Sequence, residues 1–313
     1  MDWGTLVSSI VIMGAMIGIG VLLARRTPLT SENRQLMVTI IVNVALPCII
    51  LNGIMQTPLD ETLLKQIFFI FFLSVLLNCI GIGMGWLAAK AAGASPQKAR
   101  EMAIVSALGN TGFIGLPLCA VLFGPKGALL AAVFDAGVDF TLWTVGVILL
   151  QQKRSLSLGG LKELLNIPML AIVAGLVIAL AGVQPPETVK TFVASLAALT
   201  SPLAMIYIGL LLPGLLSRKK FLPLPIIGLP IVMKLFAFPL AVILALRYVP
   251  LPVELAQVVM VQVTMPTLTL GSIVFARYAA DEQMGAMATV FSTLLSMITI
   301  PFVVMLGAKL LHI

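Results

Sequence analysis

Long apolar runs separated by short polar stretches follow one another along the whole chain. A transmembrane helix needs about 20 predominantly apolar residues, and ten stretches come close to that length. They are residues 4–23, 36–55, 66–89, 102–123, 128–150, 164–182, 192–216, 223–246, 255–276 and 285–308. The connections between them are short, so the pattern predicts no inserted soluble domain. We therefore expect an all-α polytopic membrane protein with ten transmembrane helices.

Composition supports this prediction and excludes several classes of protein. Of the 313 residues, 60% are hydrophobic and 10% are charged, whereas an ordinary soluble domain has about 25% charged residues. Too few charges remain to cover a soluble globule, and the high hydrophobicity excludes a disordered chain. The formal net charge is +7, but the basic residues lie in short clusters between apolar runs. We therefore expect a lipid bilayer as the surroundings and no nucleic-acid partner.

Cysteine and histidine offer little material for chemistry. The three cysteines, Cys48, Cys79 and Cys119, lie inside apolar segments, where packing is expected rather than a disulfide framework. The single histidine, His312, lies next to the C-terminus. We therefore predict no metal site and no cofactor.

The distribution of lysine and arginine predicts the orientation in the membrane. The odd-numbered connections hold 13 of these residues and the opposite side holds five. The 13 are Arg25, Arg26, Arg34, Lys90, Lys98, Arg100, Lys153, Arg154, Lys162, Arg218, Lys219, Lys220 and Arg277. By the positive-inside rule the odd connections face the cytoplasm, so we predict a multi-pass protein of the plasma (inner) membrane with both termini outside. Arg25 and Arg26 follow the first apolar run rather than precede it, which favours a retained helix over a cleavable signal.

Weak internal similarity predicts a repeat. Ten helices divide into five and five, and an odd number per half requires the second half to enter the membrane inverted. We place the first repeat at 1–155 and the second at 156–313. Phe134 and Phe291 fall at matching positions, and polar segments rich in glycine or proline interrupt both helix 4 (109–117) and helix 9 (261–271). Such paired interruptions are typical of inverted-repeat transporters, although membrane helices also tolerate glycine and proline for packing alone.

The segment GNTGFIGLP at 109–117 carries the strongest signal for a binding site. Its glycines permit non-helical backbone and Pro117 removes a backbone donor, so a broken helix is expected. Unpaired backbone groups at this depth must line a cavity or face protein, and the start of a half-helix attracts anions. Asn110, Thr111 and Gly112 are therefore candidates for binding an anionic substrate. The alternative is a close helix–helix contact through the glycines.

Two aspartates and one lysine lie deep inside predicted membrane helices. Asp135 and Asp139 lie well inside helix 5 and share one face because they are four residues apart. Two ionised carboxylates there are expensive, so we expect them to couple transport to a proton or Na⁺, or else to bond a neighbouring helix. Lys234 lies deep in helix 8 and is interpreted either as their counter-ion or as a direct attraction for a substrate carboxylate.

Weaker candidates for the same cavity are polar residues near prolines. Asn43 precedes Pro47 by one turn, and Thr264 and Thr267 flank Pro266. The alternative for each is a hydrogen bond to its own backbone.

The chain resembles the auxin efflux carrier (PIN-like) family of membrane transporters and looks like a bacterial-type member. The resemblance covers essentially the full length and lies in NVALPCII (43–50), GNTGFIGLPL (109–118), FDAGVDFTLWTVG (134–146), KLFAFPL (234–240) and FSTLLSMITIP (291–301). It implies two inverted five-helix repeats whose broken helices 4 and 9 cross, with Pro117 and Pro266 as the crossover prolines. It also implies that Asn110 contacts substrate and that substrates are organic anions such as auxin, malate or malonate. The long central loop of plant members is missing here, which disfavours auxin itself.

Together these observations predict a secondary active transporter, an efflux or uptake permease, for small organic anions, working by alternating access with substrate at the helix 4/9 crossover. The sequence leaves open whether the protein forms a homodimer. The main alternative is a Na⁺/H⁺-type cation antiporter of similar inverted-repeat architecture, with the aspartate pair as its ion site.

An enzyme is disfavoured. Asp135 and Asp139 resemble an isolated DxxxD motif, but a Mg²⁺–diphosphate site needs further acidic residues near a membrane face. No recognisable signalling domain supports a receptor, and no GxxxxGK[ST] motif supports direct use of ATP.

Overall fold

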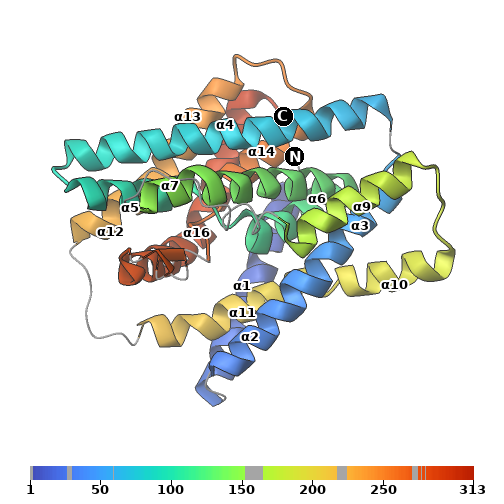
Figure 1. The fold of residues 1–313 in the computed structure, drawn as a ribbon, viewed down its shortest axis with the longest axis horizontal. Coiled ribbons are helices and arrows are strands. Elements are labelled where there is room, and N and C mark those ends of the chain that lie inside the picture. The colour runs from blue at the N-terminus through green and yellow to red at the C-terminus, as the bar shows by residue number, and fades with distance from the viewer. Residues whose placement is uncertain are drawn as a thin grey trace.

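The protein is described by a computed structural model for residues 3–26, 30–58, 60–151, 165–216, 224–269, 274–275, 277–278 and 280–313. The described residues form helices and no strands, and seven of the helices are long and apolar enough to cross a membrane. Figure 1 shows two groups of helices, one in its lower and right part and one in its upper and left part. Each of the ten predicted segments overlaps helix within the described residues.

We call the lower and right group of Figure 1 the first bundle and the other group the second bundle. The first bundle contains the N-terminal helices and those around the middle of the chain. Its elements are α1 (Trp3–Arg26), α2 (Ser31–Ile40), the π-helical turn η1 (Ile41–Ala45), α3 (Leu46–Gln56), α9 (Ile167–Leu180), α10 (Glu187–Ala197) and α11 (Thr200–Leu216). Helix α1 packs along α11, and α3 packs against α9 and α10. The α1–α11 contact depends on two glycines, because a Cβ on Gly20 or Gly209 would lie within 2.2 Å of a carbonyl oxygen of the other helix.

The second bundle contains the remaining elements. They are α4 (Glu61–Ala91), α5 (Pro96–Ala107), η2 (Thr111–Gly115), α6 (Leu116–Thr141), η3 (Leu142–Gly146), α7 (Val147–Leu150), α12 (Leu224–Val232), η4 (Met233–Ala237), α13 (Phe238–Leu246), α14 (Val253–Val263) and α16 (Glu282–Leu311). Helix α4 packs against α5 and α6, and α16 packs against α12, α13 and α14. The two bundles meet chiefly where α3 lies against α6.

The predicted connection between helices 4 and 5 is a kink within α6 rather than a loop. Gly124 has a φ of 67°, which a side chain would disfavour, and Pro125 cannot donate a helical hydrogen bond. The second half of the predicted helix 102–123 therefore runs directly into the predicted helix 128–150. The proposed repeat boundary at 155/156, and the basic residues Lys153, Arg154, Lys162, Arg218, Lys219 and Lys220, lie outside the described residues.

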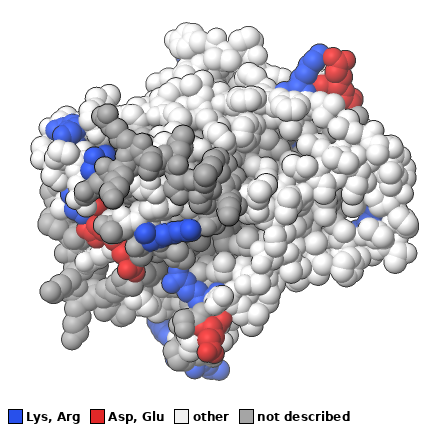
Figure 2. All heavy atoms as spheres, viewed as in Figure 1, with Lys and Arg blue, Asp and Glu red and all other residues white. Residues whose placement is uncertain are grey.

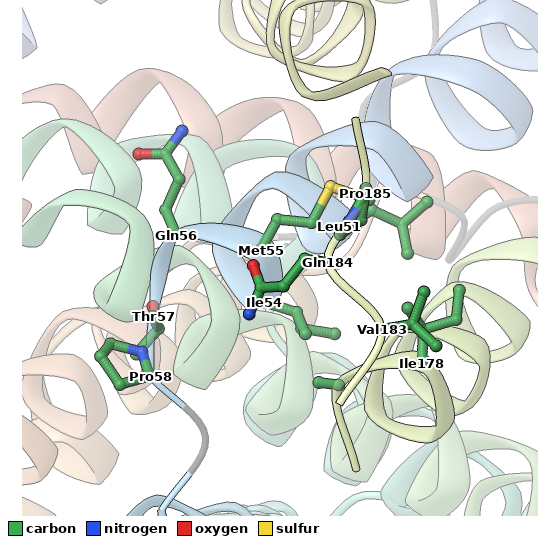
Figure 3. Close-up of a pocket in the computed structure, with 12 residues that line it drawn as sticks. Leu51, Ile54, Met55, Gln56, Thr57, Pro58, Ile178, Val183, Gln184 and Pro185 are labelled. Carbon is green, nitrogen blue, oxygen red and sulfur yellow. The ribbon is translucent and has the colours of Figure 1, made fainter. Parts of the chain in front are cut away.

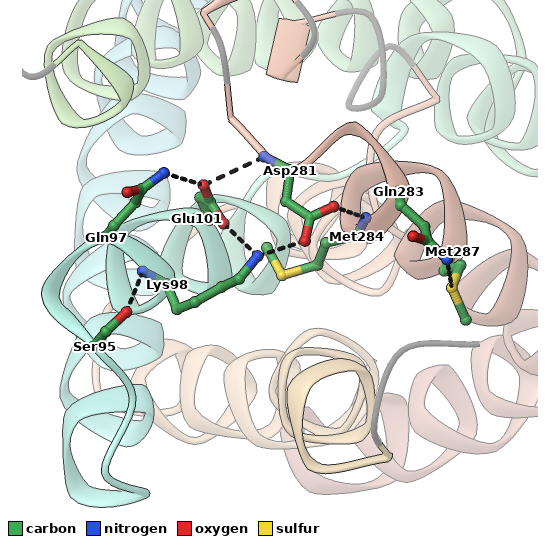
Figure 4. Close-up of polar contacts among 8 residues, drawn as sticks. All are labelled: Ser95, Gln97, Lys98, Glu101, Asp281, Gln283, Met284 and Met287. Carbon is green, nitrogen blue, oxygen red and sulfur yellow. Dashed lines mark hydrogen bonds and ion pairs between the residues drawn. The ribbon is translucent and has the colours of Figure 1, made fainter. Parts of the chain in front are cut away.

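Charged side chains gather at the margins of the molecule. In the face drawn in Figure 2 the central surface is almost entirely uncharged, and the charges lie mainly toward its left and lower edges. One cluster joins the start of α5 to the start of α16 (Figure 4): the Lys98 Nζ lies 2.9 Å from Glu101 and 2.5 Å from Asp281. Partial burial disfavours the Asp281 carboxylate, but the Lys98 ammonium and the Met284 N–H outweigh this and hold its pKa below the usual range.

Candidate functional site

The helical backbone breaks at residues 108–110 and again at residues 264–268, and the two breaks lie against each other. Asn110 N donates to the Pro266 carbonyl at 2.7 Å and Leu268 N donates to the Leu108 carbonyl at 3.2 Å. Gly109 and Thr267 thereby form an isolated antiparallel bridge. Backbone groups released from each helix are satisfied by the other break, which is what a buried interruption requires. We call these two segments the paired break.

Side chains also fasten the paired break. The Asn110 amide donates to the Thr269 hydroxyl at 2.6 Å, and the Thr267 hydroxyl donates to the Val105 carbonyl at 2.9 Å. The Thr264 hydroxyl donates to the Val261 carbonyl within its own helix end at 2.7 Å. The three predicted binding residues in these contacts are all buried, and they are bonded to protein in this conformation.

Lys234 lies where two helices end. Its Nζ donates to the carbonyls of Ala107 (2.9 Å) and Val263 (3.3 Å), the last residues of α5 and α14. The C-terminal end of a helix carries partial negative charge, so a cation there is stabilised. The side chain is 1% exposed, and its ammonium lies 5.1 Å from the centre of the Phe238 ring. Among the described residues Lys234 forms no ion pair with Asp135 or Asp139, so its observed partners are the two carbonyls.

Asp135 belongs to the second half of α6, and its carboxyl group lies beside the start of the half-helix that follows the first break. The Thr111 hydroxyl donates to Asp135 Oδ1. Position 112 leaves no room for a side chain, because a Cβ there would lie 2.6 Å from Asp135 Oδ2. A carboxylate therefore faces the positive end of η2–α6, while the Asn110 side chain accepts a hydrogen bond from Phe113 N at 3.3 Å. Cationic and anionic side chains thus complement opposite helix ends around the paired break.

Asp139 lies one helical turn beyond Asp135 and contacts the first bundle. Its Oδ2 accepts a hydrogen bond of 3.0 Å from the Asn166 amide at the start of α9. Both aspartates and Asn166 line a cavity of about 20 Å³ between the bundles. Apolar side chains form the rest of its wall: Leu46, Ile50, Leu116, Ala132, Ala136, Pro168, Met169 and Ile172. A space of this size holds a water molecule or a bare cation, but not an organic acid.

Comparison with known proteins identifies the class of molecule. Residues 5–304 match the family described as membrane transport protein. The chain belongs to this family. An uncharacterized transporter of Methanothermobacter thermautotrophicus is similar, with 23% identity over 276 residues that cover 87% of this chain and 89% of the relative. The family resemblance predicted from the sequence motifs is confirmed, and the chain is a multi-pass membrane transport protein.

A larger cavity of about 410 Å³ lies elsewhere in this membrane transport protein (Figure 3). It is formed by the C-terminal ends of α3 and α9 and the residues after them, including Gln56, Thr57, Gln184 and Pro185. Its lining contains no charged side chain, and helix C-terminal ends carry partial negative charge. This lining therefore offers an anionic substrate no positive charge.

Two predicted binding residues of the transporter, Pro117 and Asn43, do not line the cavity beside the aspartates. Pro117 is near the start of α6, directly after the π-helical turn η2. Asn43 lies in η1 with an exposed side chain, and it does not line the cavity beside the aspartates. Asn166 was not predicted as a site residue. An asparagine just before an apolar run containing proline is a signal for a helix start, but nothing local indicates that it reaches Asp139, 27 residues earlier.

Proposed function

We propose that the protein is a secondary transporter of small organic anions and that a substrate carboxylate binds beside the paired break. The observation that supports this most is the start of η2–α6, where Thr111 is bonded to Asp135 on the wall of a cavity between the two bundles. Backbone N–H groups at a helix start are suited to a carboxylate. Thr111 and Gly112 belong to that first turn, and Asn110 caps it.

The transport mechanism that we propose is alternating access. In this proposal the ten helices form two inverted repeats, 1–155 and 156–313, and the paired break is the crossover of helices 4 and 9 that contains Pro266 and precedes Pro117. The mutual hydrogen bonding of the two breaks supports this arrangement. The cavity is too small for an organic acid in this conformation, so the two bundles must separate for substrate to enter.

Coupling to a proton or Na⁺ through Asp135 and Asp139 completes the proposal. Asp135 already presents negative charge at the helix start where the substrate carboxylate would bind. Two like charges at one site repel each other, so neutralising Asp135 with a proton or a cation favours substrate binding. This predicts that substrate and coupling ion move together. Loss of coupled uptake in both Asp135→Asn and Asp139→Asn supports this step, and unchanged gradient-driven uptake in both contradicts it.

Counterflow exchange in proteoliposomes tests the substrate class. Labelled malate, malonate and indole-3-acetate are each exchanged against an excess of the same unlabelled acid inside the vesicles, which requires no knowledge of the coupling ion. We expect saturable exchange of at least one acid. Glu61→Gln is the matched control for the two aspartate variants, because the Glu61 side chain is 82% exposed and does not line the cavity. Absence of exchange for a panel of organic acids by folded protein contradicts the proposal.

A Na⁺/H⁺-type cation antiporter is the second candidate. The specific observation that favours it is the cavity of about 20 Å³, which fits a bare cation and is lined by two carboxylates. Exchange of ²²Na⁺ driven by a pH gradient, without any organic acid, would support this function. The same exchange lost in Asp139→Asn but not in Glu61→Gln would assign it to this cavity.

We also propose a plasma (inner) membrane location with both termini outside, on the basis of the lysine and arginine distribution. Single cysteines near each terminus should react with an impermeant reagent added to intact cells. A homodimer is a further proposal, and light scattering of the purified protein measures its mass directly.

A further inference from the structure

Asn166 makes two hydrogen bonds that fix the direction of its amide. Its Oδ1 accepts from Met169 N at 2.9 Å and so caps the start of α9. Because the oxygen is used by the cap, the amide N–H₂ must point the other way, and Nδ2 donates to Asp139 Oδ2 at 3.0 Å. The amide is therefore held by one bundle and presented as a donor to the other.

This hydrogen bond joins the two bundles, which must separate for a substrate to enter the cavity between them. Asn166 begins α9 in the first bundle, and Asp139 lies in α6 of the second. Both line the cavity between the bundles, which in this conformation admits no organic acid. Most of the surrounding wall is apolar and adds no directional contact. A hydrogen bond shielded from water costs free energy when it is broken without replacement, so this contact is well placed to decide when the bundles separate.

We propose that the Asn166–Asp139 hydrogen bond is a latch that holds the cavity closed between the two bundles. Asn166 is then a positioning residue: its amide sets how often the cavity opens, and it need not touch the substrate. The inference rests on the proposed function in one respect, namely that opening of this cavity is a step of transport. The latch itself can be measured without any substrate.

The variant that isolates the latch is Asn166→Asp. Aspartate caps a helix start about as well as asparagine, so α9 keeps its cap. The amide donor is lost, and a second carboxyl group faces Asp139. Opening is measured as the maleimide labelling rate of Ile172→Cys, a buried cavity-lining position of α9, with Cys48, Cys79 and Cys119 replaced by alanine. We expect labelling to accelerate by about tenfold or more, as loss of a hydrogen bond between partly buried groups implies.

Two further variants keep the proposal falsifiable. The exchange Asn166→Asp with Asp139→Asn restores one donor and one acceptor in reversed order, so we expect its labelling rate to return toward that of the parent. Asn52→Asp makes the same chemical change in α3, where Asn52 accepts an exposed hydrogen bond from Gln56, and we expect no acceleration. Melting temperatures of all variants establish that they are folded.

The outcomes separate the latch from the transport function. Unchanged labelling in folded Asn166→Asp, or acceleration in the reversed pair equal to that in Asn166→Asp, overturns the latch. Accelerated labelling with rescue by the reversed pair supports it, whatever counterflow shows. A protein that has the latch but exchanges no organic acid refutes the transport proposal instead.

Discussion

Removing the Lys234 ammonium should destabilise the protein, because the charge satisfies two helix ends at once. Lys234→Met keeps a long flexible side chain but removes the hydrogen bonds to Ala107 and Val263. A hydrogen bond to a charged group contributes about 1.5–3 kcal/mol net. Two such bonds, one of them long at 3.3 Å, therefore contribute about 3–5 kcal/mol to the free energy of unfolding.

The assay is thermal unfolding of purified protein, followed by a thiol-reactive dye or by loss of monodisperse protein on heating. A loss of this size predicts that the melting temperature falls by about 10 °C. Lys65→Met is the matched control, since the Lys65 side chain is 75% exposed and its ion pair with Glu61 lies at the surface. Exposed ion pairs contribute about 0–1 kcal/mol, so we expect a change within about 3 °C.

Two results distinguish the roles of Lys234. If Lys234→Met and Lys65→Met have the same melting temperature, the hydrogen bonds from Lys234 to the two helix ends do not stabilise the protein. If Lys234→Met melts as the parent does and loses only substrate exchange, the ammonium serves the substrate rather than the two carbonyls.

Two further predictions concern contacts around the site and at the edge of the second bundle. Gly112→Ala places a Cβ 2.6 Å from Asp135 Oδ2 and should cost about 1–3 kcal/mol, seen as a lower melting temperature, whereas Gly83→Ala, with no atom within 4 Å of the new Cβ, should not lower it. Asp281 has a lowered pKa in the folded protein, so its stabilising bond to Lys98 is present above the usual aspartate pKa of about 4 and is lost as pH falls through the folded value. The difference in melting temperature between the parent and Asp281→Asn should therefore shrink between pH 7 and pH 3, and a difference that is constant with pH would contradict this.

The membrane helices and their interruptions could be predicted because their signals are local. Twenty apolar residues span a bilayer wherever they occur, and glycine with proline weakens a helix at its own position. Residues 109–117 therefore indicated a break. That the break is satisfied by Pro266, more than 150 residues later, depends on how the helices pack, and no local pattern carries that information.

The partners of buried polar groups were the part that sequence could not supply. Lys234 was recognisable as a buried cation, but its two carbonyl acceptors are backbone atoms, and any residue type can provide them. Asn43 and Asn110 looked alike as polar residues in apolar helices, yet one is exposed and the other is 4% exposed within the paired break. Which face of a helix is covered is decided by its neighbours rather than by its own sequence.

The central claim is that an organic acid binds between the two bundles beside the paired break, and protection of a cavity cysteine tests it most directly. Leu116→Cys lies in the first turn of α6 on the cavity wall and is 1% exposed as leucine. Ala92→Cys, at the exposed end of α4, is the control. The acid that shows counterflow should slow maleimide labelling at position 116 with the same concentration dependence as exchange, and should leave position 92 unaffected. Exchange of that acid with no change in labelling at position 116 would contradict the account.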